Sequence, residues 1–179
     1  MPIPSTPRTA SPEFTDRVEA HRGILFKVAA SYGRSAEDRA DLIQDITLQL
    51  WRAWPGYDPG RPFATWMYRI ALNVAITQQR RERPLAAHDP LGEEHADLIG
   101  LDDVDAEDRE RLALVQRAMR ALGALDRALL LLHLDGCSHR EIGEVLGIRD
   151  GNVATRLGRI KQHLRRQTGA ATRNEGETR

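Results

Sequence analysis

The sequence predicts an all-α fold in which two small helical domains are joined by an acidic flexible linker, the C-terminal domain being a helix-turn-helix. Three observations support this prediction. Apolar residues recur at helical spacing along most of the 179 residues, and no segment alternates as a strand would. Segments rich in proline, glycine and acidic residues interrupt this periodicity. Charge is distributed in blocks: basic over residues 61–83, strongly acidic over 89–110 and basic again over 151–166.

The overall composition is that of a globular protein with a modest core. Hydrophobic residues make up 41% of the chain and charged residues 29%, and no apolar run reaches the length of a membrane span. The N-terminus lacks the basic-then-apolar pattern of a signal peptide. We therefore expect a cytoplasmic chain without membrane insertion. Cys137 is the only cysteine, which excludes an internal disulfide and a thiolate metal cluster.

A first domain is predicted at residues 14–84, after a disordered, proline-rich N-terminus at residues 1–13. Ser35 and Asp38 have the spacing of a capping box, which marks the start of the middle helix. Pro84 ends the last helix, because proline cannot continue the helical hydrogen bonding. The expected helices span about residues 13–32, run from Ser35 through Trp54, and span residues 63–83.

The acidic block separates this domain from the next. It contains ten acidic residues and one arginine over residues 89–110, with little periodicity, which is typical of a linker. A helix is expected at about residues 106–122, and Asp126 is expected to cap a short apolar helix at residues 127–134. We therefore predict a linker at residues 85–108, a second domain at residues 109–167 and a frayed polar tail at residues 168–179.

The strongest local pattern lies at residues 138–166 and predicts the helix-turn-helix. Ser138 and Glu141 have capping-box spacing, and Gly147 is placed to end the first helix in a left-handed conformation. Asp150 can cap the second helix. The core-facing residues of that helix are expected to be Val153, Leu157, Ile160 and Leu164.

The outer face of this second helix is basic. Residues 151–166 contain five basic residues and no acid. Such a face suits the phosphates and base edges of a DNA major groove, while a merely solvated face is the alternative. The candidate DNA-binding residues are Asn152, Thr155, Arg156 and Arg159.

Two further motifs carry a resemblance to a known family. Residues 41–51, DLIQDITLQLW, resemble the polymerase-binding helix of bacterial sigma factors, whose pattern is D-L-x-Q-[DE]. Residues 63–73, FATWMYRIALN, resemble the promoter-melting segment of the same proteins, and the helix-turn-helix resembles their domain for the −35 element. With only these two domains in a short chain, the sequence is similar to the extracytoplasmic-function (ECF) group of the sigma-70 family.

The resemblance implies a sigma factor that binds core RNA polymerase and directs promoter-specific transcription initiation. It would recognise −35 and −10 promoter elements and help to melt the −10 DNA. The resemblance also implies that the first motif binds the clamp coiled coil of the largest polymerase subunit. Four side chains of this motif, polar and apolar, share one face of the helix. The alternative to a polymerase-binding face is a face that is simply solvated. These candidate polymerase-binding residues are Asp41, Gln44, Asp45 and Leu48.

The helix that starts at Phe63 offers a second candidate surface for DNA. Its inner face is expected to consist of Phe63, Met67, Ile70 and Val74. The opposite face combines an aromatic ring with arginine and amide groups, which suits unpaired bases, although core packing is the alternative for the ring. The resemblance implies a loop near Asn73 that holds a flipped −10 base, which would interrupt a helix that the periodicity alone predicts to be continuous. The candidate −10 residues are Trp66, Arg69, Asn73, Thr77 and Arg80.

No motif indicates an enzyme. The chain has no glycine-rich phosphate loop or nucleophile elbow, and its histidines lack metal-ligand spacing, so no catalytic residue, metal or cofactor is expected. Cys137, near His139, is expected to be a structural thiol. The alternatives to a sigma factor are a transcriptional regulator whose first domain senses a signal and a sigma-like adaptor without promoter activity.

The acidic linker has two open interpretations. The resemblance implies that it threads through the polymerase near the path of template or nascent RNA, whereas a solubilising linker explains the same composition. In the free protein the linker is hypothesised to fold back over a basic face and mask DNA binding. The family also implies a possible anti-sigma factor as an inhibitor of the chain.

Overall fold

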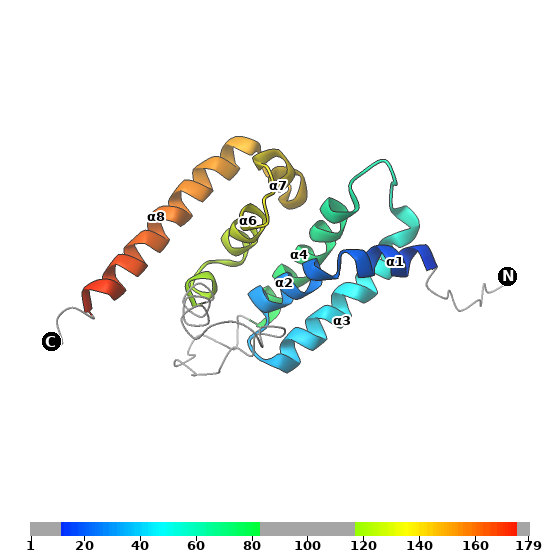
Figure 1. Cartoon of the computed structure of the whole chain (residues 1–179), viewed down its shortest axis with the longest axis horizontal. Coiled ribbons are helices and arrows are strands. Elements are labelled where there is room, and N and C mark those ends of the chain that lie inside the picture. The colour runs from blue at the N-terminus through cyan, green and yellow to red at the C-terminus, as the bar shows by residue number, and fades with distance from the viewer. Residues whose placement is uncertain (1–11, 83–116, 175–179) are drawn as a thin grey trace.

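The computed structural model describes residues 12–82 and 117–174, with side chains as far as residues 81 and 166 in the two ranges. Every regular element in these ranges is helical, which confirms the all-α prediction. The helices form two groups, coloured from blue to green and from yellow-green to red in Figure 1. The linker predicted at residues 85–108 lies outside the described residues.

The first group is a three-helix core with two short additions. Helices α2, α3 and α4 each pack against the other two. Large apolar side chains between them, Leu50, Met67 and Leu72 among them, are almost fully shielded from solvent. The elements are α1 (Pro12–Ala20), α2 (Arg22–Tyr32), α3 (Ala36–Ala53), the 3₁₀ turn η1 (Trp54–Gly56) and α4 (Phe63–Glu82).

The first predicted helix, residues 13–32, is broken at His21 into α1 and α2, so the prediction of one continuous helix is wrong. The backbone N–H of His21 donates to the Val18 carbonyl at 3.1 Å, a bond across three residues that tightens the last turn of α1. The His21 ring nitrogen Nδ1 lies 2.9 Å from the Arg17 carbonyl oxygen and so occupies an acceptor of the helix backbone. The break lets Phe14 pack on Trp54.

Helix α3 begins as the sequence predicts. The Ser35 hydroxyl accepts from the Asp38 backbone N–H at 3.0 Å, and the Asp38 carboxylate accepts from the Ser35 N–H at 3.2 Å. This reciprocal pair satisfies two backbone donors that the first turn of a helix leaves free. The capping box at Ser35 is therefore confirmed.

The second group consists of three mutually packed helices, of which α7 and the start of α8 form the helix-turn-helix. A helix was predicted at residues 106–122, ahead of this group. Residues 117–120 are helical, and residues 106–116 lie outside the described residues. Helix α8 extends to Asn174, so the frayed tail predicted at residues 168–179 is wrong for residues 168–174. The helices are α6 (Ala124–Leu134), α7 (His139–Leu146) and α8 (Asp150–Asn174).

Two predicted caps in this group are wrong. Gly123 occupies the N-cap of α6, and Asp126 lies in the first turn instead, where its carboxylate binds Arg156. Asp150 is likewise the first residue of α8 and not its cap. Both acids still lie in the first turn of a helix, where the positive end of the helix dipole favours a negative charge. The sequence therefore indicated the start of each helix correctly but not the residue that caps it.

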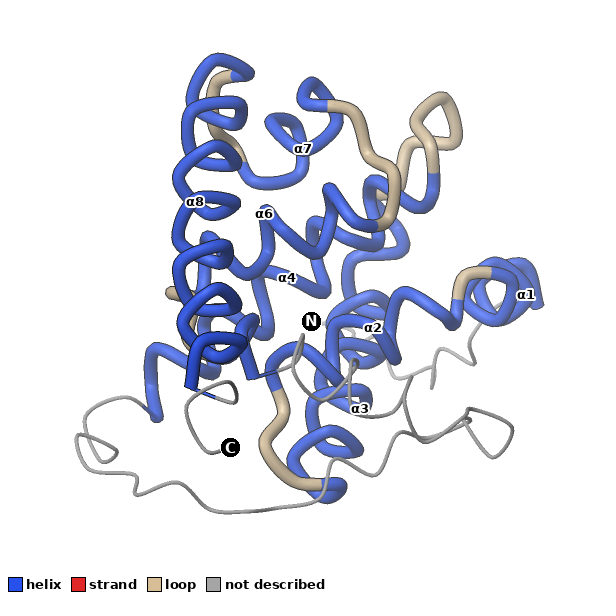
Figure 2. Tube along the Cα trace, turned by 60° about the vertical axis from the view of Figure 1, so that its left-hand side comes forward, coloured by secondary structure: helices blue, strands red, loops and turns tan. Residues whose placement is uncertain are grey.

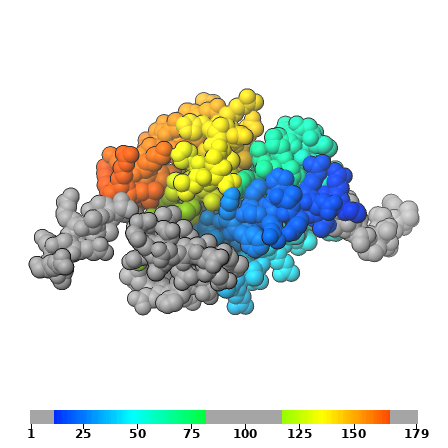
Figure 3. Space-filling model, in the orientation of Figure 1, coloured from blue at the N-terminus to red at the C-terminus, as the bar shows by residue number. Residues whose placement is uncertain are grey.

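The two groups pack directly against each other. Helix α2 contacts α6, and α4 contacts both α6 and α7. Buried apolar side chains from both groups belong to one contiguous cluster. Figure 2 shows α6 between α8 and α4, and in the space-filling view of Figure 3 the yellow atoms of the second group adjoin the blue atoms of α2. The sequence predicted two domains joined by a linker but did not predict this contact.

Candidate nucleic-acid interface

The turn of the helix-turn-helix is built from three local features. The Ser138 hydroxyl accepts from the Glu141 N–H at 3.3 Å, and the Glu141 carboxylate accepts from the Ser138 N–H at 2.8 Å, which confirms the second capping box. Gly147 ends α7 with φ of 67°, the left-handed conformation that was predicted. Gly143 faces the turn so closely that an added Cβ would lie 2.7 Å from the Ile148 carbonyl oxygen.

Helix α8 presents its candidate residues on the surface. The predicted core stripe is confirmed, because Val153, Leu157 and Ile160 are buried and Leu164 packs against the same cluster. Asn152, Thr155 and Arg159 are exposed on the other side.

Two of the four candidate −35 residues make internal contacts. The Arg156 guanidinium lies 2.8 Å from the Asp126 carboxylate of α6, so Arg156 also ties α8 to its neighbour. The Thr155 hydroxyl donates to the Gly151 carbonyl at 2.9 Å, which orients its oxygen along the helix. Within the described residues, the side chains of the other two candidates, Asn152 and Arg159, make no hydrogen bond or ion pair. Both are therefore available to a ligand.

Helix α4 is continuous from Phe63 to Glu82, as the periodicity predicts, and it lacks the interruption near Asn73 that the resemblance implied. Phe63 and Met67 are buried as predicted. Ile70 and Val74, predicted for the same inner face, are only partly buried, and Tyr68, Leu72 and Ala75 take the core positions instead. The helix is therefore rotated relative to the predicted face.

This rotation creates a groove between α3 and α4. Ile70 and Val74 line a hollow of about 550 Å³ together with Asp45 and Leu48 from α3 and with Asn73 and Thr77 from α4. Leu48 is 41% exposed, so this hollow has an apolar side chain at its surface. All four candidate polymerase-binding residues on α3 are exposed: Asp41, Gln44, Asp45 and Leu48.

Trp66 is not a free aromatic surface. Its ring centroid lies 5.0 Å from that of Tyr57, 5.3 Å from that of Phe63 and 6.3 Å from that of Trp54. The side chain is partly buried in this cluster. The remaining candidate −10 residues, Arg69, Asn73, Thr77 and Arg80, are exposed on α4.

The sequence analysis missed a polar cluster where the two helical groups meet. The Tyr68 hydroxyl donates to Asp135 at 2.6 Å, and Lys27 forms an ion pair with the same carboxylate. Partial burial raises the pKa of Asp135, but the hydrogen bonds from Lys27 and Tyr68 outweigh it and hold that pKa below its ordinary value. Burial, with the hydrogen bond and charge of Asp135, raises the pKa of Tyr68.

Neither a reactive thiolate nor a metal site is supported in the described residues. Burial raises the pKa of the Cys137 thiol, and the carboxylates of Glu141 and Asp135 raise it further, which favours the neutral form. The ranges 12–82 and 117–174 contain no group of three or more His, Cys, Asp or Glu side chains placed to hold a metal. In the same ranges no helix has the length and apolarity needed to cross a membrane.

Comparison with known families and proteins assigns both helical groups. Residues 17–84 match Sigma-70 region 2, and residues 112–164 match Sigma-70, region 4. The RNA polymerase sigma factor CnrH of Cupriavidus metallidurans is 32% identical over 160 residues, which cover 84% of this chain and 84% of that protein. The ECF RNA polymerase sigma factor SigE of Mycolicibacterium smegmatis is 29% identical over 163 residues, 88% of this chain but only 62% of that relative.

Two solved structures share the arrangement of helices. CnrH in complex with the cytosolic domain of CnrY aligns with a TM-score of 0.64 at 26% identity over 88% of both chains. The sigma factor RpoE in complex with the anti-sigma factor NepR from Bartonella quintana aligns with a TM-score of 0.67 at 21% identity, over 86% of this chain and 95% of that one.

Fold and surface together define a helical DNA-binding protein with a helix-turn-helix in its second group. The matches to both sigma regions and to CnrH narrow this class: the chain belongs to the ECF group of the sigma-70 family. It is a sigma factor that binds core RNA polymerase and promoter DNA and directs promoter-specific transcription initiation.

Proposed function

We propose that three separate faces of this chain carry out initiation. The exposed face of α3 binds the clamp coiled coil of the largest polymerase subunit. Helix α4 holds the opened −10 strand, and α8 enters the major groove of the −35 element. The chain itself performs no catalysis and acts in the cytoplasm, where core polymerase is found.

The groove between α3 and α4 is the observation that carries this proposal. Leu48 and Asp45 from the polymerase-binding face and Asn73 and Thr77 from the DNA-binding face line the same hollow. A polymerase helix bound on α3 would therefore lie beside the strand bound on α4. Exposed Leu48 supplies apolar contact area, and the carboxylates of Asp41 and Asp45 suit arginines on the partner.

At the −10 element, α4 would offset the cost of opening the duplex. Separating DNA strands loses stacking of about 1.4 kcal/mol per base-pair step. An aromatic side chain that stacks on an unpaired base recovers roughly 1–3 kcal/mol. Trp66 is partly exposed and would offer such a surface. Asn73 and Thr77 supply polar groups for a base edge, and Arg69 and Arg80 supply charge for phosphates.

At the −35 element, Asn152 and Arg159 on exposed α8 are the principal base contacts. Arginine can bind guanine O6 and N7, and asparagine can bind adenine N6 and N7. Each such bidentate pair discriminates against the wrong base by about 1–3 kcal/mol. Arg156 reaches the groove at the expense of its contact with Asp126, and Thr155 contacts the backbone or a thymine methyl group.

Run-off transcription tests this proposal. Purified chain and core polymerase are incubated with fragments that cover genomic promoters, and we expect specific transcripts from a two-element promoter. The double variant Asp45→Ala, Leu48→Ala should abolish these transcripts while duplex binding persists. Glu19→Ala, which removes an exposed acid on α1, is the control and should transcribe normally. Duplex binding without any specific transcript from the unmodified chain would favour a regulator or an adaptor.

We also infer that a protein inhibitor controls this chain, as the complexes of CnrH with CnrY and of RpoE with NepR suggest for their own sigma factors. Such an inhibitor would compete with polymerase for the exposed face of α3. Adding a purified candidate inhibitor to the run-off reaction should then suppress transcripts, and excess core polymerase should restore them. Suppression that excess polymerase does not relieve would contradict competition for α3.

A further inference from the structure

Arg156 is placed differently from the other three candidate −35 residues on α8. Asn152, Thr155 and Arg159 are exposed, whereas Arg156 is only partly exposed. With 3.6 residues per turn, Arg156 lies on the flank of the helix nearest to its buried apolar stripe. Its side chain therefore starts from the edge of the DNA-binding face, and the other three start from the open part of that face.

The Arg156 side chain is directed toward α6, the helix that packs against the inner side of α8. Its Nη1 donates to Oδ1 of Asp126, in the first turn of α6, at 2.8 Å. The two side chains are 41% and 38% exposed, so water reaches the pair. The contact is a single hydrogen-bonded ion pair, which holds the guanidinium beside α6 without enclosing it.

The guanidinium of Arg156 thus has two partners of unequal strength. A partly exposed ion pair such as that with Asp126 shifts an equilibrium by up to about fivefold. A bidentate contact with guanine favours the correct base by roughly 5- to 150-fold. The guanine contact is therefore preferred when the correct base is present. When the base is wrong, Arg156 still has the Asp126 carboxylate as a partner, so its charge is not left unpaired at the DNA surface.

We propose that Asp126 is a specificity-determining residue that relaxes the base preference of Arg156. This inference rests on the proposed contact of Arg156 with the −35 element. The net gain from the correct base is the guanine contact less the Asp126 contact that it replaces. Among the described residues Arg159 has no ion-pair partner, so the base pair that it contacts is read at full strength. Helix α8 therefore reads one −35 base pair strictly and tolerates variation at another.

The opposite role for Asp126 would be to hold Arg156 in the orientation that binds the base. Two observations argue against that role. The contact is directed toward α6, and Arg156 is less exposed than the candidates around it. The two roles predict changes of opposite sign when the Asp126 charge is removed, because a competing partner weakens base discrimination whereas an orienting partner strengthens it. One experiment therefore separates them.

The experiment uses the full chain bound to core polymerase and a promoter identified in the run-off assay. Competing promoter fragments, each with one −35 base pair replaced, measure the fold loss of affinity at every position. The variants are Arg156→Ala, Asp126→Asn and the two combined. Arg156→Ala identifies the base pair that Arg156 contacts, because replacing that pair no longer weakens binding. Asp126→Asn keeps the shape of the side chain and removes its charge.

We expect Asp126→Asn to sharpen discrimination at this one base pair. Replacing the pair should weaken binding by the Asp126→Asn variant about two- to fivefold more than binding by the unmodified chain. The loss at the base pair that Arg159 contacts should stay the same. In the combined variant, Asp126→Asn should have no effect on discrimination, because no arginine remains at position 156 to compete for.

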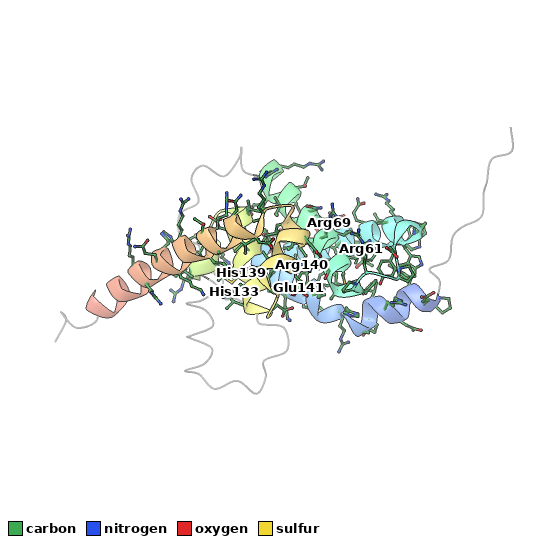
Figure 4. All side chains as sticks on the ribbon, turned by 90° about the horizontal axis from the view of Figure 1, so that it is seen from above. Arg61, Arg69, His133, His139, Arg140 and Glu141 are labelled. Atoms are coloured by element: carbon green, nitrogen blue, oxygen red, sulfur yellow. The ribbon has the colours of Figure 1, made fainter. Side chains whose placement is uncertain are left out.

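Glu144→Gln is the matched control, because it also removes an acid that pairs with an arginine. The Arg140 Nε donates to Glu144 at 3.3 Å within α7. Figure 4 shows Arg140 beside Arg61 and Arg69 in the view from above, and Glu144 lines a hollow with these two arginines. The control therefore makes the same change in charge at a different surface and should leave discrimination unchanged. An equal rise in the control would assign the effect to net charge and overturn the proposal.

Two further results would overturn the proposal. A smaller loss at the Arg156 base pair in Asp126→Asn would show that Asp126 orients Arg156 for the base. An equal loss in Asp126→Asn and the unmodified chain would show that the ion pair has no part in recognition. If Arg156→Ala alters discrimination at no base pair, the base contact itself fails and the inference fails with it. Run-off transcription by the unmodified chain reports separately whether the chain initiates at the promoter.

Discussion

The two DNA-binding helices, α8 and α4, are supported in contrasting ways. Helix α8 is set by a turn with a capping box and a left-handed glycine, and its candidate residues lie on an open face. Helix α4 has its candidate tryptophan packed among three other rings, and α7 lies in contact with this helix. The difference is that the candidate face of α8 is open along its length, whereas on α4 the aromatic candidate is part of a packed cluster and the polar candidates are exposed.

The comparison also explains the order of events that we expect at a promoter. An exposed basic helix can bind duplex DNA weakly and in a salt-dependent manner before any conformational change. On the α4 surface, Arg69, Asn73, Thr77 and Arg80 are exposed while Trp66 is partly buried. A polymerase helix bound on α3, as we propose, would lie close to this surface, because the α3–α4 groove is lined by residues of both faces.

The largest expected effect comes from Trp66→Ala. Loss of its contacts with Trp54, Tyr57 and Phe63 should lower the free energy of unfolding by about 2–4 kcal/mol, less than for a fully buried tryptophan. Urea unfolding measures the change. Trp66→Phe keeps an aromatic ring in the cluster and should cost less than about 1.5 kcal/mol. Unchanged stability in Trp66→Ala would mean that the ring is free for DNA.

The next effect concerns the rigidity of the helix-turn-helix. Gly143→Ala places a methyl group against the Ile148 carbonyl and should cost about 1–3 kcal/mol of unfolding free energy. Gly151→Ala, an exposed site on α8 with no atom near the added Cβ, should instead stabilise by up to about 1 kcal/mol. Thermal unfolding of the pair gives both values, and equal shifts would show that the turn is not closely packed.

A smaller effect separates the two arginines on α8. Arg159→Ala and Arg156→Ala should each weaken binding to a −35 duplex by about 1–3 kcal/mol if they contact base edges. Arg156→Ala should also lower stability by less than about 1 kcal/mol, because its pair with Asp126 is partly exposed. Anisotropy titrations and calorimetry on the same samples measure the two quantities. Loss of stability in Arg159→Ala would indicate an internal role for that residue.

The smallest effect is the pH dependence of the α7 cap. Hydrogen bonds from the Ser138 side chain and backbone lower the pKa of Glu141 from its reference value of 4.5. The cap therefore stabilises the folded state above pH 4.5, and this contribution is lost as pH falls through the lower folded pKa. Glu141→Gln should flatten this part of the dependence of melting temperature on pH. An unchanged profile would assign it to other carboxylates.

Features encoded by neighbouring residues were predictable from the sequence. The capping boxes at Ser35 and Ser138 and the left-handed Gly147 involve residues at most a few positions apart, and the structure confirms them. The buried stripe of α8 was also predicted, because strict helical spacing marks it clearly. The family resemblance extended this reasoning to function, and the matches to both sigma regions confirm it.

Features that depend on distant contacts were not predictable. Tyr32, Tyr68 and Arg127 look individually like core or solvated residues, and only the fold brings them together. The rotation of α4 was missed because apolar residues occur around much of that helix, so several inner faces fit the pattern. The break at His21 depends on a ring contact with the Arg17 carbonyl, which has no sequence signature.

The distance between the two helical groups tests most directly whether α4 and α8 bind separate promoter elements, because those elements lie further apart than the two helices do in the free chain. Spin labels are placed at Arg61→Cys and Arg140→Cys, exposed sites beside α4 and on α7, in a Cys137→Ser background. Pulsed electron resonance should give a short distance in the free chain. With core polymerase and promoter DNA, that distance should lengthen by more than roughly 20 Å, two interhelical spacings. The same short distance in both states, or a long one in the free chain, would contradict the account.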